Sequence, residues 1–222
     1  MNDIEIHNDV LNSSYSDFLQ EFFLDRESFP WYYMPSTAYP ISYSKKAQKE
    51  YFGGTNRNAL AQQEKDNLEW SHSFSNVLFR REEQPKPEYD LVWPAIMQII
   101  ERAEGWDHYR IEKSMIRVRV GLATRTPMPH VNTPHVDFES YDHRTLVYYV
   151  IDSDGPTIIY KQKHGRNNLD EDYALNHKEF DTVFEAPPNK NSFVVFDGER
   201  YHSSNTPVNH KERVAITINY LK

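Results

Sequence analysis

The pattern of apolar positions divides the chain into a helical first part and a strand-rich second part. Ser14 precedes apolar residues at helical spacing, namely Tyr15, Phe18, Leu19, Phe22 and Phe23. A second helical stripe ends before Gly105 and comprises Leu91, Val92, Ile96, Ile99 and Ile100. Pro94 lies within this stripe, so the second helix either begins close to it or lacks one backbone bond in its early turns. We expect two amphipathic helices within residues 1–106.

The rest of the first part has no such periodicity. Residues 29–40 are aromatic and contain three prolines, which predicts an irregular loop. Residues 41–85 are polar and are interrupted at Gly53 and Gly54, which indicates an excursion with one short helix from Leu60 to Leu68. We interpret the segment from His7 to Asp9 as a solvated tail.

After residue 106 the apolar period changes to two. Ile116, Val118, Val120 and Leu122 alternate with Arg117 and Arg119. Further β-forming segments follow at 144–151, 157–160, 180–184, 193–196 and 214–220, and short strands are expected at 131–136 and 202–206. About eight strands suit a jelly roll. The predicted fold class is α+β, mainly β, with N-terminal helices buttressing one face of the sandwich. Residues 1–106 would form an elaboration on a core of residues 107–222, within one structural unit.

Length, charge and hydropathy narrow the class of protein. A chain of 222 residues suits one domain with elaborations. The formal charge of −8, from 25 basic against 33 acidic residues, argues against a nucleic-acid partner. No segment is apolar over the length of a bilayer span, and the first ten residues have neither the basic end nor the apolar core of a signal peptide. We expect a cytoplasmic protein without a membrane partner; the sequence does not indicate its oligomeric state.

The chain contains no cysteine, so any metal site must use nitrogen and oxygen ligands. His135 and Asp137 form a His-x-Asp pair, and in an extended segment residues i and i+2 point to the same side. The pair alone is a weak signal, because His7 and Asp9 form a second copy. His202 follows an apolar strand and an Asp-Gly turn, where it can supply a third ligand. Two histidines and one carboxylate suit non-haem Fe(II), although zinc could use the same ligands.

Arg213 opens the last strand, eleven residues after His202. One face of that strand is bulky and apolar, whereas the other carries Arg213, Ala215, Thr217 and Asn219. A strand that backs a cofactor cavity would have this pattern. A guanidinium that binds a carboxylate through two parallel hydrogen bonds would suit a dicarboxylate ligand.

The order of these motifs resembles that of the 2-oxoglutarate/Fe(II) oxygenase superfamily. HVDFESYDHRTLVYYVIDSDGPTIIY, VVFDGERYHSSNTP and RVAITINYL resemble its prolyl-hydroxylase-like branch, and they are most similar to the small oxygenases of marine cyanophages. The resemblance is strong over residues 107–222. It implies a double-stranded β-helix, or cupin-like jelly roll, with the metal at one open end. For a phage-encoded member it also implies the host cytoplasm.

Position by position, the resemblance implies His135, Asp137 and His202 as metal ligands and Arg213 as the co-substrate arginine. Tyr149 matches a place where a tyrosine often supports the same carboxylate. Two positions depart from the family. Ala215 stands where some branches have a hydroxylic residue, and a tyrosine often found before the His-x-Asp pair is missing near Arg125 and His130.

The resemblance implies a dioxygenase that uses Fe(II), 2-oxoglutarate and O₂ to hydroxylate a protein side chain or a small molecule, with release of succinate and CO₂. Two alternatives stay open: a cupin-like Zn or Mn hydrolase or isomerase, and a non-catalytic jelly-roll binding module. We interpret Trp31, Tyr32 and Tyr33 as packing of an irregular loop, with the wall of a substrate pocket as the alternative. Arg117 and Arg119 are interpreted as lining one sheet face, with contact to an anionic substrate as the alternative. The remaining histidines in polar surroundings are interpreted as solvated, namely His143, His164, His177 and His210.

Overall fold

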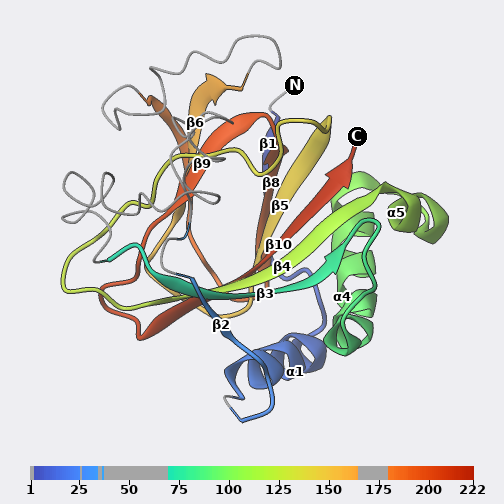
Figure 1. Ribbon diagram of the computed structural model, residues 1–222, viewed down its shortest axis with the longest axis horizontal. Helices are drawn as coiled ribbons and strands as arrows, with labels where there is room; N and C mark the ends of the chain where they lie inside the picture. Colours follow the sequence, from blue (N-terminus) through green and yellow to red (C-terminus); the bar gives the residue numbers. More distant parts are fainter. Residues whose placement is uncertain (1–2, 26, 35–36, 38–69, 165–179) are drawn as a thin grey trace, which may run out of the picture.

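A computed structural model of the chain describes residues 3–25, 27–34, 37, 70–164 and 180–222. Its two antiparallel sheets form a jelly roll (Figure 1). The main sheet has the order β1-β8-β5-β10-β4-β3-β2, and the smaller sheet has the order β7-β6-β9. The main sheet comprises β1 (Ile4–His7), β2 (Tyr32–Met34), β3 (Ser73–Arg80), β4 (Met115–Thr124), β5 (His143–Tyr149), β8 (Ser192–Asp197) and β10 (Glu212–Leu221). The smaller sheet comprises β6 (Thr157–Lys163), β7 (Thr182–Ala186) and β9 (Arg200–Ser204).

The helices pack on the face of the main sheet that points away from the smaller sheet (Figure 1). They are α1 (Ser13–Leu24), α4 (Pro87–Glu104) and α5 (His108–Ser114). Among the described residues, no helix combines the length and apolar character that a bilayer span requires. The two sheets and the helices packed on the main sheet confirm the predicted jelly roll buttressed by helices.

Helix α4 begins at Pro87 and passes through Pro94, so the proline lies inside the helix and removes a backbone donor there. Gly105 ends the helix in the left-handed region, at φ 68°, where a residue without Cβ is favoured. Helix α5 follows at once and was not predicted. It is only seven residues long, with an N-cap at Asp107, and residues 107–114 contain too few apolar positions for a helical stripe to be recognised.

The expected division of the last strand into two faces is confirmed. In β10, Val214, Ile216, Ile218 and Tyr220 lie in the core beneath the helices. The intervening residues face the interior between the two sheets. Register with β4 places Arg213 opposite Ala123, Ala215 opposite Gly121, Thr217 opposite Arg119 and Asn219 opposite Arg117. A ladder of small and polar side chains therefore runs along the inner face of the main sheet.

Three strands of the main sheet lie where none was predicted. His7 does not lie in a solvated tail, because it ends β1, which pairs with β8, and its ring stacks on Phe193 at 4.7 Å between centroids. β2 interrupts the predicted loop, and β3 lies within the predicted polar excursion. β3 was missed because three of its residues are polar yet buried, namely Ser73, Ser75 and Asn76. The helix predicted at residues 60–68 lies outside the described residues.

The prediction of solvated histidines was wrong at two positions. His143 is fully buried, and its Nδ1 lies 2.9 Å from the Tyr141 carbonyl oxygen. His164 is also buried. His210 is largely exposed, as expected, and its ring contacts Asp154. His177 lies outside the described residues. Tertiary packing buries His143 and His164 even though their sequence neighbours are polar.

Candidate active site

The fold brings together the three residues predicted as metal ligands. His135 and His202 exchange backbone hydrogen bonds of 3.0 and 2.9 Å, which pair the His135 segment with β9. The segment at 131–136 forms two isolated bridges here rather than the predicted strand. One ligand atom from each of His135, Asp137 and His202 lies within 4.8 Å of the others. A single ion could therefore contact all three side chains.

Backbone carbonyls orient both imidazoles. Nδ1 of His135 lies 3.0 Å from the Thr133 carbonyl, and Nδ1 of His202 lies 3.2 Å from the Arg200 carbonyl. Because a carbonyl can only accept, Nδ1 carries the hydrogen in each ring and Nε2 keeps its lone pair. Burial and the neighbouring His202 lower the pKa of His135 to about 4, against the opposing effect of Asp137. Burial likewise lowers the pKa of His202. Both rings are neutral at pH 7, as metal ligation requires.

Two neighbouring side chains hold the carboxylate of Asp137. Oδ2 accepts a 2.9 Å hydrogen bond from Asn219, and Oδ1 is ion-paired with Arg117. Arg117 in turn donates to Asn219 Oδ1 at 3.0 Å. Burial raises the pKa of Asp137, but Arg117 and the two histidines outweigh it and hold the pKa well below its usual range. The carboxylate is therefore ionised and oriented.

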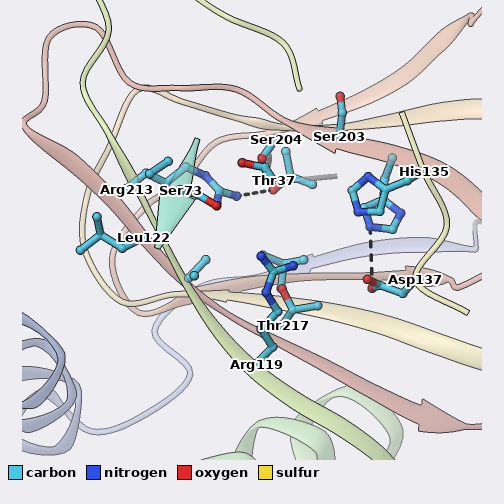
Figure 2. Close-up of a pocket in the computed structure, with 16 residues that line it drawn as sticks. Thr37, Ser73, Arg119, Leu122, His135, Asp137, Ser203, Ser204, Arg213 and Thr217 are labelled. Atoms are coloured by element: carbon cyan, nitrogen blue, oxygen red, sulfur yellow. Dashed lines mark hydrogen bonds and ion pairs between the residues drawn. The ribbon is translucent and has the colours of Figure 1, made fainter. Parts of the chain in front are cut away.

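A cavity of about 70 Å³ extends from these three residues to Arg213, between the two sheets (Figure 2). Its inner wall includes the small residues Gly121, Ala123 and Ala215, which leave room beside the ladder of β4 and β10. The remaining lining residues are mostly hydroxylic, aliphatic or basic: Thr37, Ser73, Arg119, Leu122, Val147, Thr157, Ser203, Ser204 and Thr217. The cavity therefore has a candidate metal site at one end and a cation at the other.

Arg213 is buried at the far end of this cavity. Its Nε donates to the Gly155 carbonyl at 2.8 Å and its Nη2 donates to Thr157 Oγ1 at 2.7 Å. Within the described parts of the chain, no carboxylate pairs with Arg213. The guanidinium is held rigidly while its charge stays available to a ligand.

Tyr149 contacts Arg213 and is not among the residues that line the cavity. The guanidinium carbon of Arg213 lies 5.4 Å from the centroid of the Tyr149 ring. The Tyr149 hydroxyl donates to Thr157 Oγ1 at 2.8 Å. Because Thr157 Oγ1 accepts from both neighbours, its own hydrogen is free to be donated, and Thr157 faces the cavity.

Thr157, Gly155 and Asn219 were not predicted to belong to the site, and Arg117 was predicted to line a sheet face without a contact to Asp137. Gly155 lies in the connection between β5 and β6, and Thr157 begins β6. No local pattern distinguishes either residue from others in similar connections. Arg117 and Asn219 did carry a signal, since the period of two places them on the polar faces of their strands. That Arg117 and Asn219 meet Asp137 depends on the strand register, which became known only with the fold.

No protein-family model matches the chain, and no curated protein is similar to it in sequence. Solved structures are similar to it in fold. The non-haem alpha-ketoglutarate-dependent epimerase SnoN from nogalamycin biosynthesis is 12% identical, with a TM-score of 0.59 over 99% of this chain and 76% of that one. An oxidoreductase of the 2OG-Fe(II) oxygenase family from Burkholderia pseudomallei is 10% identical, with a TM-score of 0.55 over 99% of this chain and 85% of that one.

A prolyl hydroxylase from Trichoplax adhaerens, in complex with a peptide fragment of hypoxia inducible factor, is also similar. It is 14% identical, with a TM-score of 0.51 over 100% of this chain and 84% of that one. Identities this low establish the fold and nothing finer. The chain therefore has the double-stranded β-helix fold that these oxygenases share.

Proposed function

We propose that this chain is an Fe(II)- and 2-oxoglutarate-dependent dioxygenase that hydroxylates its substrate. One observation carries the proposal: a single cavity has two imidazoles and a carboxylate at one end and a buried guanidinium at the other. A short dicarboxylate could reach both ends. Solved structures of similar fold support this assignment, among them SnoN in complex with Fe³⁺ and alpha ketoglutarate.

The residues at the metal end fit a divalent ion on chemical grounds. His135 and His202 present unprotonated Nε2 atoms, and Asp137 presents an ionised carboxylate whose oxygens keep lone pairs. Two nitrogens and one oxygen on one side leave coordination positions for further ligands, which suits non-haem Fe(II). When bound here, Fe(II) with 2-oxoglutarate and O₂ supplies substrate hydroxylation coupled to oxidation of the co-substrate to succinate and CO₂.

The far end of the cavity would bind the 5-carboxylate of 2-oxoglutarate. Arg213 supplies the charge, and Thr157 supplies a hydroxyl donor beside it. Tyr149 would support the same carboxylate indirectly, because its hydroxyl and ring hold Thr157 and Arg213. At the metal end, Arg117 and Asn219 would keep Asp137 oriented toward the ion.

The substrate would be a protein side chain or a small molecule. Solved structures of similar fold include one complex with a peptide fragment and one with nogalamycin RO. The net charge of −8 argues against nucleic acid. A cytoplasmic location and a relationship to cyanophage oxygenases remain predictions that rest on the sequence.

Binding of metal and co-substrate tests the proposal. We expect a visible absorption band when Fe(II) and 2-oxoglutarate are added without oxygen, and succinate release when oxygen is admitted. His135→Ala should abolish both signals, because it removes a metal ligand. Arg213→Met should retain metal binding but lose co-substrate affinity by roughly 30-fold or more, because it removes one partner of a buried charge pair.

The two alternatives predict different results in the same assay. A Zn or Mn hydrolase or isomerase would bind metal without any dependence on 2-oxoglutarate, and Arg213→Met would leave metal-dependent properties unchanged. A non-catalytic module would bind no metal. Arg213 is buried at one end of the cavity and has no carboxylate partner among the described residues, which favours the oxygenase.

A further inference from the structure

Arg119 is a second arginine in the cavity. It projects from β4 into the space between Arg213 and the metal triad (Figure 2). Across the strand pair it lies opposite Thr217 of β10, which lines the same space. In the described parts of the chain, neither side chain forms a hydrogen bond or an ion pair. Both groups can therefore donate hydrogen bonds to an incoming ligand.

Arg119 remains charged at neutral pH. Burial, with a smaller contribution from Arg117, lowers its pKa to about 10, and Asp137 opposes this effect. A partly buried guanidinium that has no acceptor among the described residues is stabilised by an anion. The position of Arg119 therefore favours an oxyanion beside the metal site.

The balance of charge around the cavity also favours an anion beside the metal site. The described residues around the cavity include one carboxylate, that of Asp137, and three guanidiniums, those of Arg117, Arg119 and Arg213. Arg117 and Asp137 compensate each other as an ion pair. A divalent metal and the dianion 2-oxoglutarate would also compensate each other, which leaves an excess of positive charge. A further anionic group would reduce that excess.

The ladder of β4 and β10 separates the two arginines. Arg213 pairs with Ala123, and Arg119 pairs with Thr217. The cross-strand pair of Gly121 and Ala215 is the rung of the ladder between these two pairs. Four residues of strand separate Ala123 from Arg119, roughly 13 Å between Cα atoms. The small rung leaves space between the guanidiniums, so Arg119 can contact a carboxylate other than the one that Arg213 binds.

We propose that Arg119 and Thr217 form a second carboxylate-binding site in the cavity, next to the metal triad. This proposal rests on the proposed function. The carboxylate belongs either to the primary substrate or to the metal-bound end of 2-oxoglutarate. The chemistry is the same in both cases: the guanidinium and the threonine hydroxyl donate hydrogen bonds to one carboxylate.

The test measures calorimetric binding to the Mn(II)-loaded protein with four probes. 2-Oxoglutarate has both carboxylates, levulinate lacks the metal-end carboxylate, and 2-oxovalerate lacks the far one. Acetate is added after saturation with 2-oxoglutarate, as a probe for a substrate carboxylate. Arg119→Gln and Thr217→Val are compared with Arg80→Gln, because Arg80 is an exposed arginine that pairs with Glu83 outside the cavity.

In Arg119→Gln we expect at least a tenfold loss of affinity, either for the two probes with a metal-end carboxylate or for acetate. In Thr217→Val we expect a smaller loss for the same probes. If 2-oxoglutarate and 2-oxovalerate weaken while levulinate does not, the site takes the metal-end carboxylate. If acetate alone weakens, the site takes a carboxylate of the primary substrate. Unchanged affinity for all four probes in Arg119→Gln, in a variant that melts like the native protein, overturns the proposal.

Arg119→Lys provides a second variant if Arg119→Gln does not fold, because it retains the charge and most of the volume. It should retain part of the affinity that Arg119→Gln loses. The proposed function fails separately from this inference. If the native protein binds Mn(II) but no 2-oxoglutarate, the oxygenase assignment is wrong. Acetate binding to the metal-loaded protein and to Arg119→Gln still tests the second site in that case.

Discussion

The guanidinium of Arg117 is paired with Oδ1 of Asp137, whereas Nε2 of His202 lies 3.8 Å from Oδ2 of the same carboxylate. The side chains of Arg117 and Asp137 are 12% and 5% exposed, so this is a buried ion pair. Removing one partner of such a pair leaves an uncompensated charge in a poorly solvated place. Arg117 thus stabilises Asp137 in the metal-free protein, a role that a bound ion can share.

We predict that Arg117→Met destabilises the metal-free protein by about 3 kcal/mol, because Asp137 loses its cation. Added Zn(II) should raise the melting temperature of the variant more than that of the native protein, because the ion replaces the missing positive charge. Thermal unfolding with and without the metal measures both effects. Equal shifts in the two proteins would contradict the prediction. Combining Arg117→Met with Asp137→Asn should recover much of the stability without metal.

Tyr149→Phe removes the hydroxyl that donates to Thr157 Oγ1. We expect a loss of about 1 kcal/mol in the free energy of unfolding. Affinity for 2-oxoglutarate should fall roughly fivefold, because Thr157 and Arg213 lose a contact that orients them.

Tyr148→Phe is the matched control for this substitution. Tyr148 is also fully buried, but its hydroxyl lies on the helix side of the sheet and donates to Asn191 at 3.1 Å. Tyr148→Phe should lower the free energy of unfolding by a similar amount and leave the affinity for 2-oxoglutarate unchanged. Denaturant unfolding and calorimetric titration separate the two effects. An equal loss of affinity in both variants would count against a role for Tyr149.

Two glycines near the cavity should differ in how their replacement by alanine changes the stability of the fold. A Cβ on Gly121 would meet nothing within 4 Å, so Gly121→Ala should fold with equal or slightly greater stability. The added methyl would lie in the cavity, and we expect at least a tenfold loss of 2-oxoglutarate affinity. An unchanged affinity would mean that the co-substrate does not lie over this rung.

Gly155→Ala should instead destabilise the fold. A Cβ at Gly155 would collide with the Asn205 carbonyl and press on the backbone of Pro207. We expect a loss of about 2 kcal/mol in the free energy of unfolding. Because the Gly155 carbonyl accepts from Arg213, co-substrate affinity should fall as well. Denaturant unfolding of the two alanine variants side by side checks this contrast, and a Gly155→Ala protein as stable as the native one would refute it.

Asp3, which immediately precedes β1, should make stability sensitive to acid. Hydrogen bonds from Arg200 lower the pKa of Asp3 to about 2, with a further contribution from Lys163. The folded pKa thus lies below the unfolded value of about 3.9, so the stabilisation is complete above pH 4 and is lost as the pH falls toward 2. The side chain is 31% exposed, which limits the effect to less than about 1 kcal/mol.

Asp3→Asn should therefore be less stable than the native protein at pH 7, and most of this difference should be lost near pH 2. Urea unfolding at several pH values measures the difference. A difference that stays constant down to pH 2 would show that the carboxylate charge is not responsible.

The local pattern of the chain predicted the parts of the fold that depend on neighbouring residues. The period of two placed Val214, Ile216 and Ile218 on the core face of β10 and Arg213 with Ala215 on the other. The helical stripe predicted α4, and Gly105 marked its end. The motif order singled out His135, Asp137, His202 and Arg213, all of which the fold brings to one cavity. Periodicity is encoded within a few residues, so it can be read without the fold.

Only the tertiary structure decided which distant residues meet. Arg117 reaches Asp137, and Arg213 reaches Thr157, through strand registers that no local sequence pattern specifies. β1 and β3 exist as strands because neighbouring strands accept their backbone hydrogen bonds, even though their own sequences are short or polar. The physical reason is the same in each case. A contact between remote segments is stabilised by pairing and burial across the sheets, and its partners become defined only when the sheets form.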